Sequence, residues 1–583
     1  MNPQSVLKEK FGYDNFRQGQ QEVIDGILAG EDVLAIMPTG GGKSLCYQIP
    51  ALILDGLTLV VSPLISLMKD QVDALNENGI AATFINSTLD YMEVRERFNQ
   101  AARGEVKLLY VSPERLDSDG FMADLAQLKI DLVAIDEAHC ISQWGHDFRP
   151  SYLRLTETIQ RLNSNPTIIA LTATATSQVA ADIMQRLAIV HEVKTGFSRE
   201  NLAFQVVKDQ NSDRFLLDYL KAQKQQSGII YASTRKEVER LTKLIKKAKI
   251  KVAMYHGGMK EDERRQNQED FLYDRVQVMI ATNAFGMGID KSNVRFVIHA
   301  QIPGSLEAYY QEAGRAGRDG LPSEAVLLFN LKDVQIQHFF IDQSEMDEIN
   351  KKHEYLKLQE MTQYANTQQC LQQTIVNYFG DEAPECGRCS NCLDTRDAQD
   401  ISIDAQKVLS CVKRMDEHFG KVLVAQVLTG SKVQKVMQFR FDELPTYGLM
   451  KDRSQKEVSG LIDYLVASGF LQASSGQYPV LQLAADGVGV LKGETKVTRK
   501  MAVKVRQALP EDNELFEELR QLRRELAEEQ GVPPFVIFSD KTLYSMCEIM
   551  PETLTEMLDV KGVGESKLEK YGELFLDILN AED

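Results

Sequence analysis

The chain has 583 residues, of which 43% are hydrophobic and 26% are charged, and this composition is typical of globular proteins. One hydrophobic core does not sustain a chain of this length, so we expect about three to five domains. No apolar run approaches the roughly 18 residues that span a bilayer, and Met1 does not open a basic-then-apolar signal peptide. From these observations we expect a cytoplasmic protein, and neither a membrane-spanning nor a secreted one.

The formal net charge is −18, and an acidic protein repels polyanions on average. The local field matters more than the average, and basic residues gather in 235–251 and in 496–506. Each cluster is a candidate contact for phosphates. A solvated helix face or a linker is the alternative interpretation of both.

Short apolar runs alternate with stretches of helix length in the first 330 residues, which is typical of parallel sheets wrapped by helices. The first series of expected strands is 33–36, 57–61, 108–111, 132–135 and 167–171. The second series is 228–231, 276–280, 294–298 and 325–329. Two similar sheets predict two α/β domains with a cleft between them.

The first apolar run leads into a glycine-rich segment, Met37-Pro38-Thr39-Gly40-Gly41-Gly42-Lys43-Ser44. A buried strand that opens into such a loop lets backbone N–H groups converge on phosphate oxygens at the start of the next helix. Lys43 would neutralise the β and γ phosphates and Ser44 would bind Mg²⁺. Met37 stands where the strict phosphate-loop pattern has its first glycine, so an ordinary glycine-rich turn is the alternative.

Two carboxylates follow a second apolar run, in the tetrad Asp136-Glu137-Ala138-His139. An α/β sheet binds its ligand at the carboxyl ends of its strands, which is where Asp136 and Glu137 are expected. Together with the glycine-rich loop, this tetrad predicts a site that hydrolyses a nucleoside triphosphate.

The segment that follows the tetrad is aromatic and basic, and it holds the only tryptophan of the chain, Trp144, together with Phe148 and Arg149. Single-stranded nucleic acids stack on aromatic faces beside arginines. Trp144 as a core anchor is the alternative. Further on, Gln311 is followed by Arg315 and Arg318, whose guanidinium groups suit the charge that develops on a transferred phosphoryl group.

Four of the eight cysteines lie close together, as Cys370 and the run Cys386-x-x-Cys389-x-x-Cys392. Four thiolates in a reducing compartment favour a structural Zn²⁺ site, and an iron–sulfur cluster is the alternative. The other cysteines, Cys46, Cys140, Cys411 and Cys547, are expected to be buried or free thiols.

The C-terminal third is expected to be mainly helical. In 401–483 helices precede a short hairpin, which suggests a winged helix, although a plain helical packing domain fits the pattern equally well. Val458, Leu461, Ile462, Leu465 and Val466 would form the buried face of one helix. A linker and a small helical domain follow, in which the turn 560–564 either binds a phosphate or only connects two helices.

These residues resemble the RecQ DNA helicases of helicase superfamily two over nearly the whole chain. The resemblance rests on the opening motif around Tyr13, Arg17 and Gln20, on Thr39 to Ser44, on Asp136 to His139, on Thr172 to Thr174, on 280–290, on Gln311 to Arg318, and on the loop around Trp144. It implies an α/β fold with two RecA-like domains, a zinc-binding subdomain, a winged helix and an HRDC-like domain. The corresponding ranges are 1–205, 206–335, 336–398, 399–490 and 513–583, with a linker at 491–512.

The resemblance also implies roles for individual residues. Tyr13, Arg17 and Gln20 would bind adenine, and Thr39, Gly40, Gly41, Gly42 and Lys43 would bind the phosphates. Ser44 and Asp136 would bind Mg²⁺, Glu137 would orient the attacking water, Gln311 and Arg315 would contact the γ-phosphate, and Arg318 would be the arginine finger. Cys370, Cys386, Cys389 and Cys392 would bind Zn²⁺, and Trp144, Phe148 and Arg149 would contact DNA.

The implied activity is ATP-dependent 3′-to-5′ translocation on single-stranded DNA with unwinding of duplex DNA, in repair, recombination, replication and the SOS response. Single-stranded and duplex DNA are the implied partners, with single-stranded-DNA-binding protein or other repair proteins as further candidates. A nucleoid-associated location would follow in a bacterium. An ATPase scaffold that does not unwind, and an RNA-directed motor, remain open alternatives.

The sequence departs from the family pattern at two places. Leu371, Gln372 and Gln373 follow Cys370 where the family commonly has arginines, and the terminal domain is acidic over 511–529. The first departure puts a phosphate contact near Cys370 in doubt, and the second puts in doubt whether the terminal domain binds DNA or protein. Residues 423–438 are a candidate for the strand-separating hairpin.

Overall fold

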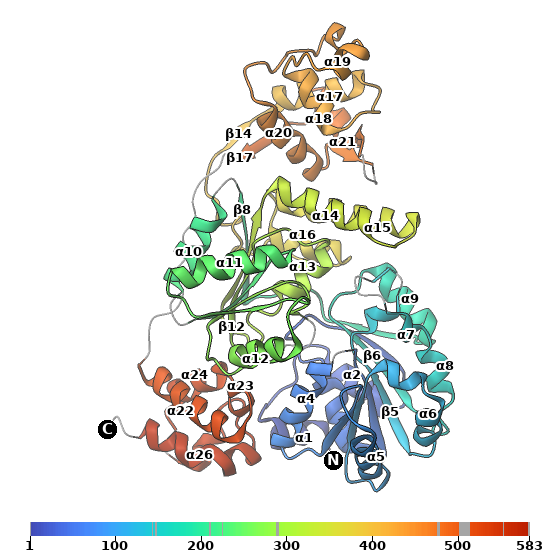
Figure 1. The fold of residues 1–583 in the computed structure, drawn as a ribbon, viewed down its shortest axis with the longest axis vertical. Coiled ribbons are helices and arrows are strands. Elements are labelled where there is room, and N and C mark those ends of the chain that lie inside the picture. Colours follow the sequence, from blue (N-terminus) through green and yellow to red (C-terminus); the bar gives the residue numbers. More distant parts are fainter. Residues whose placement is uncertain are drawn as a thin grey trace.

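The structure is a computed structural model that describes residues 2–63, 65–142, 144–145, 149–208, 211–223, 226–286, 291–474, 479–500, 514–551 and 553–580. Two α/β lobes lie in the lower and middle parts of the molecule, a mainly helical domain with two small sheets extends at the top, and the C-terminal helices pack beside the lower lobe (Figure 1). None of the helices in the described ranges combines the length and the apolar character needed to cross a membrane.

Lobe 1 (residues 2–194) contains a sheet of seven parallel strands in the order β3-β4-β2-β5-β6-β1-β7. Its strands are β1 (Val33–Ile36), β2 (Leu57–Val61), β3 (Ala82–Ile85), β4 (Leu108–Val111), β5 (Ile130–Ile135), β6 (Thr167–Thr172) and β7 (His191–Lys194). Its α-helices are α1 (Pro3–Phe11), α2 (Gln20–Leu28), α3 (Leu45–Ile53), α4 (Ile65–Glu77), α5 (Tyr91–Ala102), α6 (Asp119–Leu125), α7 (Pro150–Leu153), α8 (Leu155–Gln160) and α9 (Ser177–Leu187).

The strand β1 shows why an unbroken apolar run was a reliable signal. Leu34 and Ile36 pack into the core on one face of the sheet, while Val33 and Ala35 pack into the core on the other face. Helices cover both faces of such a sheet, so every side chain of a central strand must be apolar. The polar groups of the site therefore lie where the strands end.

Lobe 2 (residues 202–329) has a six-stranded parallel sheet in the order β10-β11-β9-β12-β13-β8. Its strands are β8 (Leu202–Lys208), β9 (Ser227–Tyr231), β10 (Val252–Tyr255), β11 (Val278–Ala281), β12 (Val294–His299) and β13 (Ser323–Phe329). Its helices are α10 (Ser212–Ala222), α11 (Arg235–Lys247), α12 (Glu261–Leu272) and α13 (Leu306–Ala313). Residues 195–201, here called the connector, join the two lobes.

A helical region and the upper domain follow lobe 2. The helical region comprises α14 (Leu331–Gln343), α15 (Glu348–Asn366) and α16 (Leu371–Tyr378). The upper domain comprises β14 (Ala398–Asp400), α17 (Ser402–Arg414), α18 (Lys421–Leu428), α19 (Gln434–Gln438), α20 (Gln455–Ala467), β15 (Leu471–Ala473), β16 (Leu481–Leu483), α21 (Ala485–Leu491) and β17 (Thr498–Lys500).

The upper domain has the predicted helices followed by an antiparallel pair, β15 and β16. A capping box between Ser454 and Glu457 starts α20, and Val458, Ile462 and Leu465 are fully buried. The prediction that 423–438 forms a hairpin is wrong, because α18 and α19 occupy this range. The apolar run Val422 to Ala425 fits either a short strand or a buried helix, and packing of α18 against α17 and α20 selects the helix.

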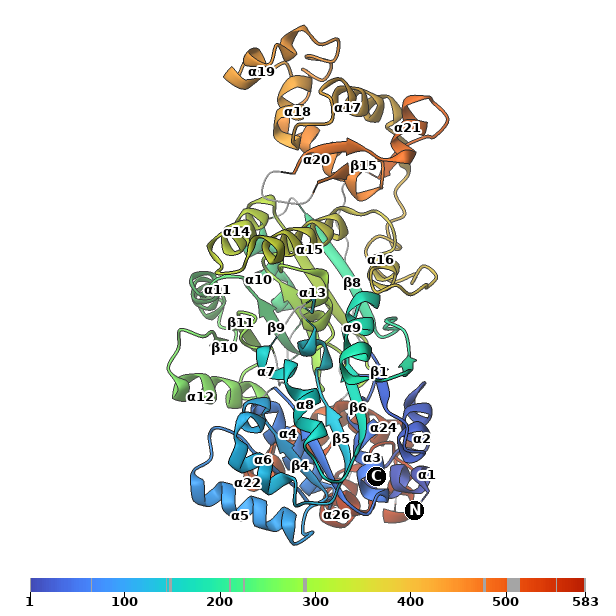
Figure 2. The same ribbon diagram turned by 90° about the vertical axis from the view of Figure 1, so that its right-hand side faces the viewer.

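The C-terminal domain consists of α22 (Glu514–Gln530), α23 (Pro534–Ile537), α24 (Asp540–Ile549), α25 (Leu554–Met557) and α26 (Glu565–Leu579). It has its own apolar core and docks on both lobes, beside α12 and α1 (Figures 1 and 2). The Gly562 N–H donates to the carbonyl of Gly12 at 3.0 Å. The turn 560–564 connects α25 to α26, as one of its two interpretations has it, and it also forms a contact between domains.

Candidate functional site: the cleft between the two lobes

The glycine-rich loop (residues 37–44) adopts a conformation that its glycines make possible. Gly40 and Gly42 have φ values of 81° and 79°, in the left-handed region that glycine occupies without strain. A Cβ on Gly41 would lie 2.9 Å from the carbonyl oxygen of Pro38. Met37, which departs from the strict pattern, is buried in the core of lobe 1. The departure therefore falls on the first residue of the loop and leaves its three glycines in place.

Residues of the opening motif bind the backbone of this loop. The side-chain amide of Gln20 donates to the Gly42 carbonyl at 2.9 Å and accepts from the Arg17 N–H at 2.8 Å. The Arg17 guanidinium donates to the carbonyl of Gly40. Both side chains also line the cavity between the lobes, so the opening motif bonds to the glycine-rich loop, called the phosphate loop from here on, and forms part of the cavity wall.

Lys43 is folded against its own loop. Its Nζ donates to the Met37 carbonyl at 3.1 Å. Burial lowers the pKa of Lys43 below its usual value, while the nearby carboxylates of Glu137 and Asp136 act in the opposite direction. An incoming phosphate would replace the carbonyl as the partner of a cation that is already desolvated.

The two carboxylates lie at the carboxyl end of β5, as the sequence predicted. The Asp136 N–H donates to the Val61 carbonyl at 2.9 Å, which continues the sheet, whereas Glu137 has a φ of 48°, uncommon for a residue with a side chain. Glu137 Oε2 lies 3.4 Å from His139 Nδ1, and this nitrogen lies 3.0 Å from Thr172 Oγ1. The chain of contacts connects the acidic tetrad to the last residue of β6.

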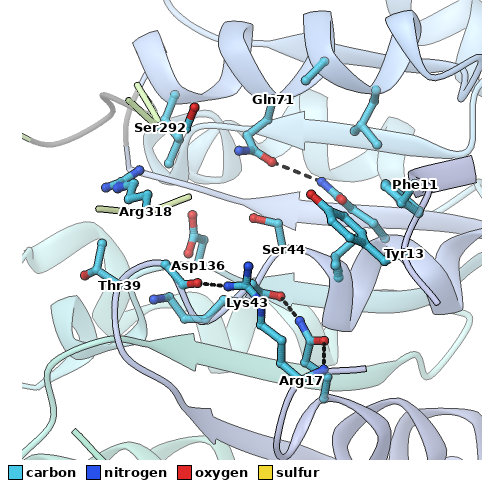
Figure 3. Close-up of a pocket in the computed structure, with 18 of the residues that line it drawn as sticks. Phe11, Tyr13, Arg17, Thr39, Lys43, Ser44, Gln71, Asp136, Ser292 and Arg318 are labelled. Carbon is cyan, nitrogen blue, oxygen red and sulfur yellow. Dashed lines mark hydrogen bonds between the residues drawn. The ribbon is translucent and has the colours of Figure 1, made fainter. Parts of the chain in front are cut away.

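Lobe 2 contributes residues from α13 and from residues 314–318, here called the arginine loop. Inside the lobe, His299 Nε2 and Glu312 Oε2 are 2.8 Å apart, which fixes α13 against β12. A Cβ on Gly40 would lie 3.3 Å from Arg318 Cα, so the arginine loop approaches the phosphate loop closely. Figure 3 shows Arg318, Thr39 and Asp136 at the same end of the cavity.

These residues line one cavity of about 370 Å³, a volume in the range of small-molecule sites. The predicted residues on its wall are Tyr13, Arg17, Gln20, Thr39, Gly40, Gly42, Lys43, Ser44, Asp136, Glu137, Gln311, Arg315 and Arg318. Gly41 shapes the loop without lining the cavity. Further lining residues that sequence reasoning missed include Gln48, Gln71 and Ser292, which are isolated polar residues without a motif around them.

The cysteine cluster is assembled as predicted. The sulfur atoms of Cys370, Cys386, Cys389 and Cys392 lie within 4.8 Å of one another. Backbone N–H groups donate to the sulfurs, for example from Cys386 to Cys370 Sγ at 3.2 Å and from Cys389 to Cys386 Sγ at 3.3 Å. Such donors stabilise thiolates, so the cluster fits a closed, tetrahedral Zn²⁺ site.

The aromatic loop reaches the helical region that carries the cysteine cluster. The Trp144 ring makes an edge contact with the ring of His353 in α15, with centroids 4.6 Å apart. Arg149 Nη1 donates to the carbonyl of Pro63 at 3.1 Å, so its side chain has a role within lobe 1. Phe148 lies outside the described residues. The DNA contacts predicted for these three residues stay predictions.

Five protein-family models match successive parts of the chain. They are the DEAD/DEAH box helicase at residues 17–183, the helicase conserved C-terminal domain at 211–320, RecQ zinc-binding at 331–393, the RQC domain at 395–508 and the HRDC domain at 512–579. The two-lobed helicase fold and the appended zinc-binding, winged-helix and HRDC regions are thereby confirmed, as is the expectation of ATP, Mg²⁺ and Zn²⁺.

Relatives resemble the chain over its whole length. It is 53% identical to the ATP-dependent DNA helicase RecQ of Bacillus subtilis, with 99% of this chain and 98% of that protein aligned. It is 42% identical to the RecQ of Haemophilus influenzae, with 99% and 95% aligned. The chain therefore belongs to the RecQ family of ATP-dependent DNA helicases.

Proposed function

We propose that this protein moves along single-stranded DNA in the 3′-to-5′ direction, driven by ATP, and separates duplex DNA ahead of it. The observation that carries the proposal is that Lys43 of lobe 1 and Arg318 of lobe 2 line the same cavity. A nucleotide bound there would draw the lobes together, and its hydrolysis would release them. The direction of movement rests on the family resemblance.

Each side chain has a defined task in this proposal. Arg17 and Gln20 bind the adenine, and Lys43 neutralises the phosphates. Ser44 and Asp136 would hold Mg²⁺, whose bound charge offsets the negative charge of the phosphates. Glu137 orients the attacking water from a fixed backbone position.

The lobe 2 residues would complete the site only when the cleft is closed. Gln311 and Arg315 contact the γ-phosphate, and Arg318 stabilises the charge that develops on it during transfer. A residue that crosses the cleft makes hydrolysis depend on the distance between the lobes. DNA bound across both lobes thereby controls the rate of hydrolysis.

Trp144 would report bound DNA to this site. It lies on the loop that follows Glu137 and His139, so a base that displaces the Trp144 ring from His353 pulls on the segment that carries the catalytic carboxylate. Stacking of a base on an aromatic ring contributes about 1–3 kcal/mol, enough to replace an edge contact of this kind. Roles in repair and recombination, and an interaction with single-stranded-DNA-binding protein, are part of the proposal through the family alone.

Strand displacement on matched substrates tests the proposal. A duplex with a 3′ single-stranded overhang should be unwound with ATP, while the same duplex with a 5′ overhang should not. The matching RNA strands should stimulate hydrolysis poorly. Hydrolysis without displacement on either overhang would favour an ATPase scaffold, and stronger stimulation by RNA would favour an RNA motor.

A further inference from the structure

Arg199 occupies a position in the connector that none of the sequence motifs points to. Its side chain is buried, with 7% of the residue exposed, at the place where the two lobes meet. The guanidinium donates to the carbonyl of Thr39 in the phosphate loop. It also donates to carbonyls of the arginine loop, at 3.1 Å to Ala316 and 3.0 Å to Gly317. One side chain therefore bonds to both loops that border the ATP cavity.

These acceptors are neutral, and the described part of the chain gives Arg199 no salt bridge. Burial lowers the pKa of Arg199 below its usual value, so the fold bears a desolvation cost at this position. A buried cation is retained at such a cost when its fixed fork of donors sets a geometry that another residue does not reproduce. Here the geometry is the separation of the phosphate loop from the arginine loop.

The same position lies against Gly40, the glycine that approaches Arg318. A Cβ on Gly40 would lie 3.6 Å from Arg199 Nη1 and 3.3 Å from Arg318 Cα. Asn201, two residues further along the connector, adds a 2.7 Å bond from its side-chain amide to the Gly317 carbonyl. The connector thus fixes the arginine loop by several bonds at the side of the cavity where the γ-phosphate would lie.

The backbone carbonyl of Arg199 accepts a hydrogen bond from a residue of the cysteine cluster. Arg388, between Cys386 and Cys389, donates through Nη2 to the Arg199 carbonyl at 2.6 Å and to Gln372 Oε1 at 2.7 Å. Gln372 Nε2 donates to Ser198 Oγ at 2.6 Å. The amide of Gln372 thus serves as acceptor for Arg388 and as donor to Ser198 at once, which a side chain with donors alone does not do.

We propose that Arg199 is a positioning residue for ATP hydrolysis, which sets the arginine loop against the phosphate loop, and that Arg388 and Gln372 tie this residue to the cysteine cluster. The proposal rests on the proposed function in one respect, since it takes Arg318 to act on the γ-phosphate. It makes the cysteine cluster part of the ATPase mechanism as well as of the fold. A loosened cluster would slow hydrolysis without any loss of a group that touches ATP.

Steady-state ATPase kinetics with saturating single-stranded DNA test the role of Arg199. In Arg199→Gln the value of kcat should fall about 10- to 100-fold, the effect of misplacing a catalytic group by about 1 Å, while KM changes less than about threefold. Binding of a fluorescent ATP analogue should stay near the wild-type value. Arg199→Lys, which retains the charge but not the fork, should recover part of kcat. An unchanged kcat in Arg199→Gln, or an equal loss in analogue binding, would overturn the proposal.

Arg388→Met tests whether the hydrogen bonds between the cysteine cluster and Arg199 affect ATP hydrolysis. This variant also tests the proposal if Arg199→Gln does not fold. This variant should lower kcat about 3- to 10-fold and still contain one zinc per chain by elemental analysis. The double variant should be no slower than Arg199→Gln alone, because both act through one contact. Arg396→Met is the matched control, since Arg396 pairs with Asp394 near the same cysteines, and its kcat should be unchanged.

The reference variant Lys43→Ala separates failure of this inference from failure of the proposed function. If Lys43→Ala is inactive while Arg199→Gln and Arg388→Met hydrolyse ATP normally, the cavity is the ATPase site and the inference is wrong. If Lys43→Ala also hydrolyses ATP normally, the proposed function of the cavity is wrong.

Discussion

Lys43 is the residue whose position in the cleft leads to the simplest prediction. Its ammonium group is already desolvated and lies against the Met37 carbonyl, ready to exchange this partner for a phosphate. Lys43→Ala should reduce ATP hydrolysis by at least about 10³-fold, because the charge that cradles the β and γ phosphates is removed. The fold should persist, and this is checked by an unchanged circular dichroism spectrum. Turnover near the wild-type rate would refute a phosphate role for Lys43.

Trp144 offers a direct optical test because it is the only tryptophan of the chain. The edge contact with His353 should break when a DNA base stacks on the indole, so single-stranded DNA should change the intrinsic fluorescence. Trp144→Ala should lose most of the stimulation of ATPase activity by DNA and retain the basal rate.

The matched variant for this test is His353→Ala. It should alter the emission of the free protein and leave that of the DNA complex nearly unchanged. If DNA leaves the emission of the wild type unaltered, or if Trp144→Ala loses basal and stimulated activity equally, Trp144 is a packing residue.

At the scale of elements, the cysteine cluster is expected to support the helical region that contains α16. Cys389 is buried, and its sulfur accepts from the N–H groups of Leu371 and Cys392. Cys389→Ser should lose zinc and lower the melting temperature by roughly 5–10 °C, because metal binding contributes directly to folding. Zinc content and calorimetry check this together. An unaltered melting curve at reduced zinc content would show that the cluster has no structural role.

The docking of the C-terminal domain depends on a buried group of charges. Asp274 of lobe 2 lies 2.6 Å from Lys291 and 4.0 Å from Arg523 of α22, which in turn pairs with Asp540 at 2.8 Å. These cations hold the pKa of Asp274 below its usual value, against the effect of burial. Asp274→Ala removes the ion-pair partner of the buried Lys291 and one of the two carboxylates beside Arg523, and it should weaken docking by roughly 3–5 kcal/mol.

Hydrogen exchange in α22 and α24 measures this effect, with Asp270→Ala, near the same turn, as the control. Faster exchange in the Asp274 variant alone is expected. Equal exchange in both variants would mean that other contacts hold the domain, such as the 2.8 Å pair between Lys570 and Glu77.

The sequence predicted the central strands well because a strand covered on both faces has to be apolar throughout. Edge strands lack this signal: β7 reads His-Glu-Val-Lys and only its valine is buried, so no apolar run marks it. The candidate hairpin at 423–438 failed for the complementary reason, since a short apolar run does not distinguish a strand from a buried helix.

At the scale of the whole molecule, the motifs predicted which loops form the cleft but not what ties the loops together. Arg199 bonds to carbonyls more than 100 residues away in either direction of the chain, and any residue type provides a carbonyl, so no pattern marks the partners. The ion pair between Asp274 and Arg523 likewise joins two domains through charged residues that belong to no sequence motif. Contacts of this kind depend on the relative placement of folded domains, which local periodicity does not encode.

Closure of the two lobes on one nucleotide can be tested by recording single-turnover ATP hydrolysis and strand displacement in one reaction on a duplex with a 3′ overhang, for the wild type and for Arg318→Lys. We expect the variant to bind the ATP analogue normally and to lose at least about 10³-fold in both hydrolysis and displacement, since an arginine that crosses the cleft contributes that much. Normal hydrolysis by Arg318→Lys, with displaced strand produced at the wild-type rate, would contradict a motor driven by closure of the two lobes on one nucleotide.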